Sequence, residues 1–186
     1  MGSVYTAFLA EAGNELWAID LWREHLDAIM QQGLKVSGFS GERTVTGINA
    51  STNISDAYAC ELVVIATKTS AVASVARSLQ GQLREGALIL TIQNGLGAGE
   101  RIRGSLDSAN ILLGIAGGFG ASMAGVLVMD CVEPRAEKPK VWVQIERMHR
   151  KLRVLDAFFS RVRSGLRVRL RAHDRTHERT YIHTAG

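Results

Sequence analysis

The chain has 186 residues, of which 46% are hydrophobic, and a formal net charge of +4. Its length suffices for one domain with a buried core, or for one domain plus an appendage. The two cysteines, Cys60 and Cys131, show no spacing typical of a zinc site or a disulfide framework, so we expect no metal and a cytoplasmic location. Glu11 interrupts the first apolar stretch and no basic region precedes it, so a signal peptide is not expected.

Charge divides the chain into two unlike parts. Residues 1–123 carry eight Lys/Arg and eleven Asp/Glu, a net charge of −3, whereas residues 124–186 carry fourteen and seven, a net charge of +7. Both prolines and four of the five histidines also lie in the second part. A charge asymmetry of this kind indicates a basic tail with a role or an origin different from that of the first part.

The first part alternates helical and strand patterns. The predicted elements are a helix over 2–12, a strand over 16–19, a helix over 23–32, a hairpin or two short strands within 35–49, a strand over 62–66, a helix after residue 70, a strand over 87–92, a short helix over 99–106 and a strand over 111–116. This order predicts a Rossmann-like, doubly wound α/β domain with a mostly parallel sheet. The strand over 62–66 is apolar throughout and is expected to be buried on both faces, and the strand over 87–92, apolar except for Thr91, is expected to be another buried strand.

Some side chains on the predicted helices have expected positions. On the helix over 23–32, Leu26, Ile29 and Met30 form the apolar side, and His25 is expected at the surface. Ser70 is expected to cap the helix that follows it. The inward side of that helix is expected to comprise Val72, Val75, Ala76 and Leu79.

The stretch 108–129 has no charged side chain and is long enough to span a bilayer. Five glycines thin its apolar surface, which favours a buried strand followed by a glycine-rich loop. No membrane association is therefore predicted.

The start of the chain resembles the end of a dinucleotide-binding fingerprint. Gly2 stands where the last glycine of G-x-G-x-x-G would precede a phosphate-binding helix, although the two earlier glycines and their strand are absent and Gly2 alone could be an ordinary residue. Asp20 ends the next strand, where an acidic residue binds an adenosine ribose and favours NAD. Arg23 could instead hold a 2′-phosphate and favour NADP, or the two could form a solvated charge pair.

Two further residues follow predicted strands at the carboxyl edge of the sheet, where open α/β sheets bind ligands. Lys68 could contact a phosphate or carboxylate there, or simply face solvent. Asn94 lies in TIQNGLG, where Asn-Gly indicates a turn, and its amide could also bind a substrate carbonyl or a nicotinamide.

These segments together resemble the ketopantoate reductase (2-dehydropantoate 2-reductase) family. The likeness runs in order through MGSVYTAFLAEAGNELWAID, WREHLDAI, ELVVIATKTSAV, LTIQNGLGAGERI and NILLGIAGGFGASM, over residues 1–123. It implies an N-terminal Rossmann domain, a helical C-terminal domain and NADPH-dependent reduction of a 2-keto acid to pantoate. It also implies that Gly2 and Lys68 bind the cofactor and that Asn94 meets both nicotinamide and substrate.

The sequence departs from this family in three respects. A strand and two glycines are missing before Met1, and Asp20 resembles NAD-type members. After Met123 we match neither the general-acid lysine nor the substrate-binding glutamate and serine, and Asn94 can orient a substrate but cannot supply a proton. We therefore expect an incomplete member of the family, with weak cofactor binding and no turnover.

Several interpretations of residues 124–186 and of the whole chain stay open. The basic tail could bind nucleic acid, although we find no recognition motif, or it could be an out-of-frame reading of the gene. Within it, the pattern of apolar residues is compatible with a strand over 142–145 and a helix over 148–162. The alternatives for the whole chain are another NAD(P)-dependent dehydrogenase of the β-hydroxyacid type and a non-catalytic cofactor-binding module. The expected partner is a small 2-keto acid; the sequence does not predict an oligomeric state.

Overall fold

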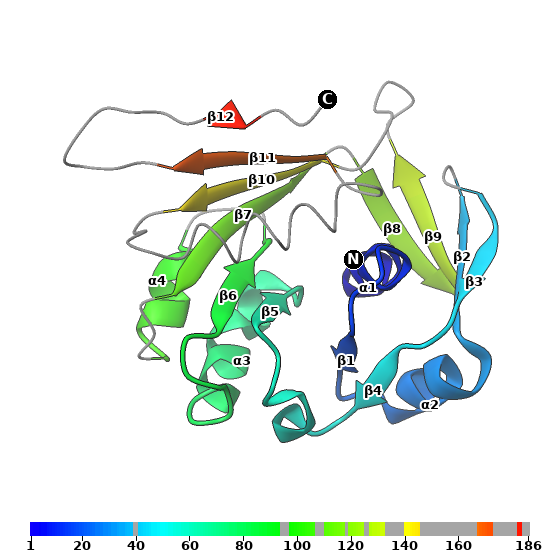
Figure 1. Ribbon diagram of the computed structural model, residues 1–186, viewed down its shortest axis with the longest axis horizontal. Coiled ribbons are helices and arrows are strands. Elements are labelled where there is room, and N and C mark those ends of the chain that lie inside the picture. Colours follow the sequence, from blue (N-terminus) through cyan, green and yellow to red (C-terminus); the bar gives the residue numbers. More distant parts are fainter. Residues whose placement is uncertain are drawn as a thin grey trace.

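Helices and sheets of the chain are arranged as shown in Figure 1, a computed structural model. The structure describes residues 1–38, 41–93, 97–106, 110–117, 119–124, 127–132, 140–145, 167–172 and 182–183, with side chains up to residue 114. The helical elements are α1 (Gly2–Glu11), α2 (Arg23–Gln32), η1 (Ile54–Ala57), η2 (Thr69–Ala71), α3 (Val72–Ser78) and α4 (Ala98–Arg103). The strands are β1 (Trp17–Ile19), β2 (Leu34–Gly38), β3 (Arg43–Val45), β4 (Asn49–Ser51), β5 (Leu62–Ile65), β6 (Leu88–Thr91), β7 (Ile111–Gly117), β8 (Phe119–Ala124), β9 (Leu127–Val132), β10 (Lys140–Ile145), β11 (Arg167–Ala172) and β12 (Ile182–His183).

The strands form three sheets. The largest has the order β12-β11-β10-β7-β6-β5, in which β5, β6 and β7 are parallel, β10 is antiparallel to β7, and β11 is parallel to β10. A four-stranded sheet has the order β3-β2-β9-β8, and β1 and β4 form a parallel pair. Apart from the three consecutive strands β2, β3 and β4, strands and helices alternate from α1 to β7, and the predicted Rossmann-like α/β class is confirmed.

Alternate side chains of β6 pack into two separate cores. Leu88 and Leu90 join the cluster built around α1, together with residues of β2 and β3. Ile89, between them, joins the second cluster with residues of α3 and α4. Because successive strand residues point to opposite faces, the helices cover both faces of this sheet, as a doubly wound fold requires.

Burial differs between β5 and its neighbour β6. All four residues of β6 are buried, whereas in β5 only Ile65 is buried and the other three residues are half-buried. Among the described residues, β5 pairs with β6 alone and β1 pairs with β4 alone, so each strand has one edge without a sheet partner. The expectation of complete burial is therefore confirmed for β6 and wrong for β5, because only one side of β5 is covered by a strand.

The turn after α2 shows why a glycine ends that helix. Gly33 has a φ of +77°, and a Cβ there would lie 2.8 Å from the carbonyl oxygen of Val45. A side chain at this position would therefore be strained and would also collide with the backbone of β3. The predicted helix over 23–32 and its stop at Gly33 are confirmed.

Three local expectations are wrong. Met30 is 53% exposed, so α2 buries only Leu26 and Ile29 of the three apolar residues expected inward. Ser70 lies within η2, and the cap position of α3 is Ala71, which makes no side-chain cap hydrogen bond. The expected glycine-rich loop after β7 is instead strand β8, which pairs antiparallel with β9, because glycine is tolerated in a paired strand.

The basic second part contributes strands to the sheets of the first. The strand predicted over 142–145 is confirmed as part of β10, which pairs with β7, and β9 pairs with β2. The helix predicted over 148–162 lies outside the described residues. None of the described helices is long and apolar enough to cross a membrane.

Candidate functional site

The carboxyl ends of β5 and β6 are joined by one buried side chain, that of Gln93. Its Nε2 donates hydrogen bonds to the carbonyl oxygens of Ile65 (2.7 Å) and Thr67 (3.1 Å). The hydroxyl of Thr91 donates to Gln93 Oε1. A neutral amide thus satisfies one carbonyl group at the end of β5 and one just after it, where the sheet ladder ends and backbone groups need other partners.

Lys68 directly follows Thr67, whose carbonyl accepts from Gln93. It is exposed at the start of η2 and has an extended backbone. Its position beyond the end of β5 agrees with the predicted place at the carboxyl edge of the sheet. Asn94, predicted to meet nicotinamide and substrate, lies outside the described residues. Its neighbour Gln93 was not predicted to have a role, although the buried-strand pattern leading into TIQNG placed it at the sheet edge.

The first turn of α1 lies beside the same strand end. A Cβ added at Gly2 would lie 3.5 Å from Cβ of Ala66, which is ordinary van der Waals contact. The helix has no side-chain cap hydrogen bond at its N-terminus and no acidic residue in its first turn. A helix start of this kind favours an anion electrostatically. Helix packing therefore does not itself require glycine at this position.

Asp20 follows β1 and holds the next two residues by their backbone. Its Oδ1 accepts hydrogen bonds from the N–H groups of Leu21 (2.7 Å) and Trp22 (3.1 Å). The side chain is exposed, and its second carboxylate oxygen makes no hydrogen bond or ion pair within the described residues. Arg23 begins α2 directly afterwards and is also exposed. A carboxylate fixed through one oxygen in this way can accept ribose hydroxyls through the other.

His25 is buried rather than at the surface, so that expectation is wrong. It is 6% exposed, and its ring stacks on Trp22 with 5.2 Å between ring centroids and 26° between ring planes. Its Nε2 lies 3.4 Å from the hydroxyl oxygen of Ser3 in α1. The position of His25 on the helix after Asp20 suggested the surface, but contacts with Trp22 and with Ser3 of α1 cover the imidazole.

The start of α1 is a neighbour of both strand ends. Gly2 lies close to Ala66, two residues before Lys68, and Ser3 contacts His25 of α2, the helix that begins after Asp20.

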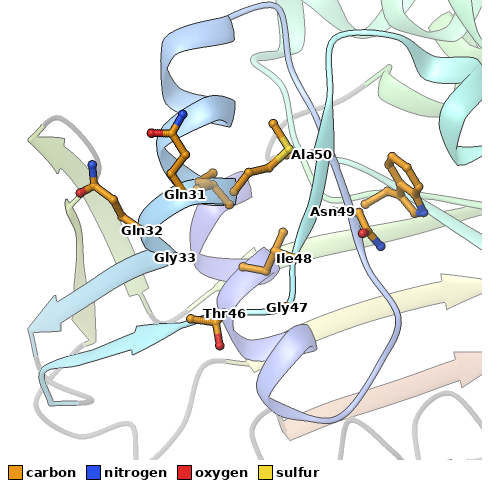
Figure 2. A pocket seen from close by; sticks show the side chains of 11 residues that line it. Gln31, Gln32, Gly33, Thr46, Gly47, Ile48, Asn49 and Ala50 are labelled. Carbon is orange, nitrogen blue, oxygen red and sulfur yellow. The ribbon is translucent and has the colours of Figure 1, made fainter.

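A pocket of about 400 Å³ lies elsewhere (Figure 2). It opens between the end of α2 and the amino ends of β1 and β4, and its residues are Trp17, Ile29, Met30, Gln31, Gln32, Gly33, Thr46, Gly47, Ile48, Asn49 and Ala50. No charged side chain is among them, and Asp20 lies at the opposite end of β1. The pocket therefore offers nothing that would hold a pyrophosphate, and we do not assign the cofactor to it.

The described residues were also considered as a reactive thiol or a metal site. Burial, with a smaller contribution from the Glu15 carboxylate, raises the pKa of the Cys60 thiol, which keeps it protonated and unreactive. No group of three or more potential metal-ligating side chains occurs in the described part of the chain. Neither observation suggests a nucleophile or a metal centre.

The fold is that of a Rossmann-like α/β protein, and comparison with known proteins is consistent with this. The model of the family "Ketopantoate reductase PanE/ApbA" matches residues 1–130, past the predicted boundary at residue 123. The chain belongs to the ketopantoate reductase family. This is a family of NAD(P)-dependent oxidoreductases.

Curated relatives carry the same name. A 2-dehydropantoate 2-reductase of Halobacterium salinarum is 32% identical over 114 residues, which cover 61% of this chain and 37% of the relative. One from Lactococcus lactis is 28% identical over 116 residues, with coverage of 61% and 37%. The aligned part of this chain thus spans little more than a third of the length of these relatives.

Solved structures agree on the fold. A 2-dehydropantoate 2-reductase from Geobacter metallireducens superposes with a TM-score of 0.72 at 24% identity, covering 89% of this chain and 53% of that chain. D-mandelate dehydrogenase, solved with NADH and anilino(oxo)acetate, gives a TM-score of 0.72 at 20% identity, covering 90% and 53%.

Proposed function

We propose that this chain provides the nicotinamide-cofactor-binding part of a reductase that converts the 2-keto acid 2-dehydropantoate to pantoate. The observation that carries the proposal is the pair of groups linked by the first turn of α1. One group is the uncapped helix start beside Ala66, two residues before Lys68, and the other is the fixed carboxylate of Asp20. Family membership supports the reaction class, and the names of the relatives support the substrate.

Each residue has a distinct part in this proposal. Gly2 and the first turn of α1 would hold the pyrophosphate, Lys68 would bind a phosphate or the substrate carboxylate, and Asp20 would bind the adenosine ribose. The cofactor supplies the hydride. Asn94 would orient the keto group but has no proton to give to the developing alkoxide, so we expect binding without turnover from this chain alone.

The choice between NADH and NADPH follows from Asp20 and Arg23. The family resemblance implies NADPH, and the exposed Arg23 could meet a 2′-phosphate. The Asp20 carboxylate, held by two N–H groups beside the ribose position, would repel that phosphate. We infer that NADH binds more tightly than NADPH.

The domain boundary and the location belong to the same proposal. We place the cofactor-binding domain within residues 1–123 and treat residues 124–186 as a basic segment that adds strands to it. We propose a cytoplasmic location, where the free thiol of Cys60 remains reduced.

Calorimetric titration of the full chain with NADH and NADPH tests the proposal. We expect saturable binding that Lys68→Ala weakens about tenfold, because a hydrogen bond to a charged group contributes about 1.5–3 kcal/mol and 1.4 kcal/mol corresponds to tenfold. Lys35→Ala, which removes an exposed charge on β2, is the control and should bind like the wild type. Absence of binding of either cofactor to the wild type would refute the proposal. Oxidation of cofactor that depends on 2-dehydropantoate would contradict the expectation of no turnover.

A further inference from the structure

The segment at the end of β5 is held at both of its ends by one side chain. The amide nitrogen of Gln93 donates to the carbonyl oxygens of Ile65 (2.7 Å) and Thr67 (3.1 Å), which lie on either side of Ala66. The hydroxyl of Thr91 donates to the amide oxygen, and this bond sets which end of the amide faces the two carbonyl groups. The nitrogen of one buried amide thus fixes three consecutive residues.

These three residues, 65–67, form the clamped segment, which leads directly into Lys68. The carbonyl oxygen of Thr67 accepts from Gln93 before this lysine, and the carbonyl oxygen of Lys68 itself accepts from the N–H group of Ala71 at 2.9 Å. The backbone of Lys68 is therefore fixed on both sides. Its side chain is exposed and makes no hydrogen bond or ion pair within the described residues, so the ammonium group is available to an anion.

We propose that Gln93 is the positioning residue for Lys68 in the ligand site. This inference rests on the proposed cofactor-binding function. Gln93 is buried and acts through the clamped segment, not through contact with a ligand. Without the amide, the two carbonyl groups would need water as their partner, and the backbone that carries Lys68 would be held less firmly. A ligand would then have to order this backbone as it binds, and the cost of ordering lowers affinity.

A purely structural role of Gln93 is the competing explanation. In that case, loss of the amide lowers the free energy of unfolding but leaves the contribution of Lys68 to binding intact. Positioning predicts instead that substitutions at Gln93 and Lys68 are not additive in ligand affinity, because both act on the same contact. A double-mutant cycle on ligand affinity therefore separates the two explanations.

Gln93→Met provides one side of this cycle, since methionine has a similar length but no donor. The full chain is titrated by calorimetry with NADH and with 2-dehydropantoate, because Lys68 is proposed to bind a phosphate or the substrate carboxylate. We expect Lys68→Ala to weaken one of these probes about tenfold in the wild-type chain and less than about threefold in Gln93→Met. Gln93→Met alone should weaken the same probe about threefold to tenfold.

Matched variants separate the amide from its surroundings. Thr91→Ser keeps the hydroxyl that orients the amide, so Lys68→Ala should have its full effect there. Thr91→Val removes the hydroxyl and should reduce that effect. Val45→Ala changes a buried residue of β3, in a different sheet, and should lower the free energy of unfolding while leaving the effect of Lys68→Ala at about tenfold.

The possible results decide between positioning and structure. An undiminished effect of Lys68→Ala in Gln93→Met would overturn the positioning role while leaving cofactor binding intact. An effect of Lys68→Ala that is absent for both probes would also overturn it. The same holds if Val45→Ala removes the effect, since the loss would then follow stability alone. If the wild-type chain binds neither NADH nor NADPH, the proposed function itself fails and this inference fails with it.

Discussion

The strand ends at β6 and β1 position polar residues in opposite ways. After β6, Gln93 is buried and donates to the carbonyl groups of Ile65, which ends β5, and of Thr67. After β1, Asp20 is exposed and accepts from the N–H groups of its own loop. The first arrangement fastens one segment to another through a neutral amide, and the second fixes a single turn around a charge.

This difference suggests that Gln93 contributes to the stability of the fold and that Asp20 contributes to ligand binding. A neutral amide can be buried at small cost when all its partners are present, whereas a carboxylate in the same place would require a compensating cation. Asp20 remains in water and keeps one oxygen for a ligand. We therefore expect substitutions at Gln93 to change the free energy of unfolding and substitutions at Asp20 to change ligand preference.

The largest expected effect is that of Gln93→Ala. Removal of the amide leaves two carbonyl oxygens without their donor, and a buried unsatisfied polar group costs about 1–3 kcal/mol. Urea unfolding should show this loss in the free energy of unfolding. Gln80→Ala, at an exposed position after α3, should change it by less than about 0.5 kcal/mol. Equal free energies of unfolding for Gln93→Ala and Gln80→Ala would contradict a stabilising role of the Gln93 hydrogen bonds.

Asp20→Asn tests the other side of the comparison. The amide oxygen of asparagine can still accept the loop N–H groups, so the free energy of unfolding should hardly change, but the negative charge is lost. The ratio of NADPH to NADH affinity should rise about tenfold, which corresponds to about 1.4 kcal/mol. Asp27→Asn removes the same charge within α2 and should leave the ratio unchanged. A ratio that does not move in Asp20→Asn would remove Asp20 from the cofactor site.

Gly2→Ala distinguishes packing from ligand binding on α1. The added methyl would meet Ala66 at 3.5 Å, an ordinary contact, and alanine favours a helix over glycine by up to about 1 kcal/mol. Urea unfolding should therefore show unchanged or slightly greater stability, while NADH affinity should fall if the pyrophosphate needs the open backbone. A variant that loses stability would show that the glycine serves packing.

The smallest effect concerns pH and Tyr5, on the helix that links the two strand ends. Burial raises the pKa of Tyr5 above its usual value. Between the unfolded pKa of about 10 and the higher folded pKa, the unfolded chain binds fewer protons than the folded one, so stability falls as pH rises through that window and is fully present below it. Tyr5→Phe should flatten this decline in urea unfolding above about pH 10, and the exposed Tyr58→Phe should not. An undiminished decline in Tyr5→Phe would exclude Tyr5 as its source.

Much of the first part of the fold follows from sequence patterns. The periodic apolar residues Leu26 and Ile29 of α2 and the apolar residues of β6 predict their elements, because local pattern and burial agree there, Met30 of α2 excepted. The half-exposure of β5 could not be predicted, since an apolar run does not show how many strands flank it. The glycines of β8 suggested a loop because strand pairing with β9 depends on a distant segment.

The sequence order indicates that Gly2, Asp20 and Lys68 lie next to strand ends, and their roles in binding stay predictions. The contacts that support these positions could not be predicted from the sequence. The roles of Gln93 and His25 depend on which segments pack together: one bonds a chain segment more than twenty residues away, and the other is turned inward against α1. Such contacts have no local signature.

The unpaired edge of β5 has a consequence for how this chain behaves in solution. Its backbone N–H and C=O groups on that side have no ladder partner in the described sheets, and its half-buried side chains are apolar. An apolar strand with one open side is a template onto which an extended segment of another molecule can add. We therefore expect that the apparent mass of the chain in size-exclusion chromatography rises with its concentration if a second copy adds along the β5 edge.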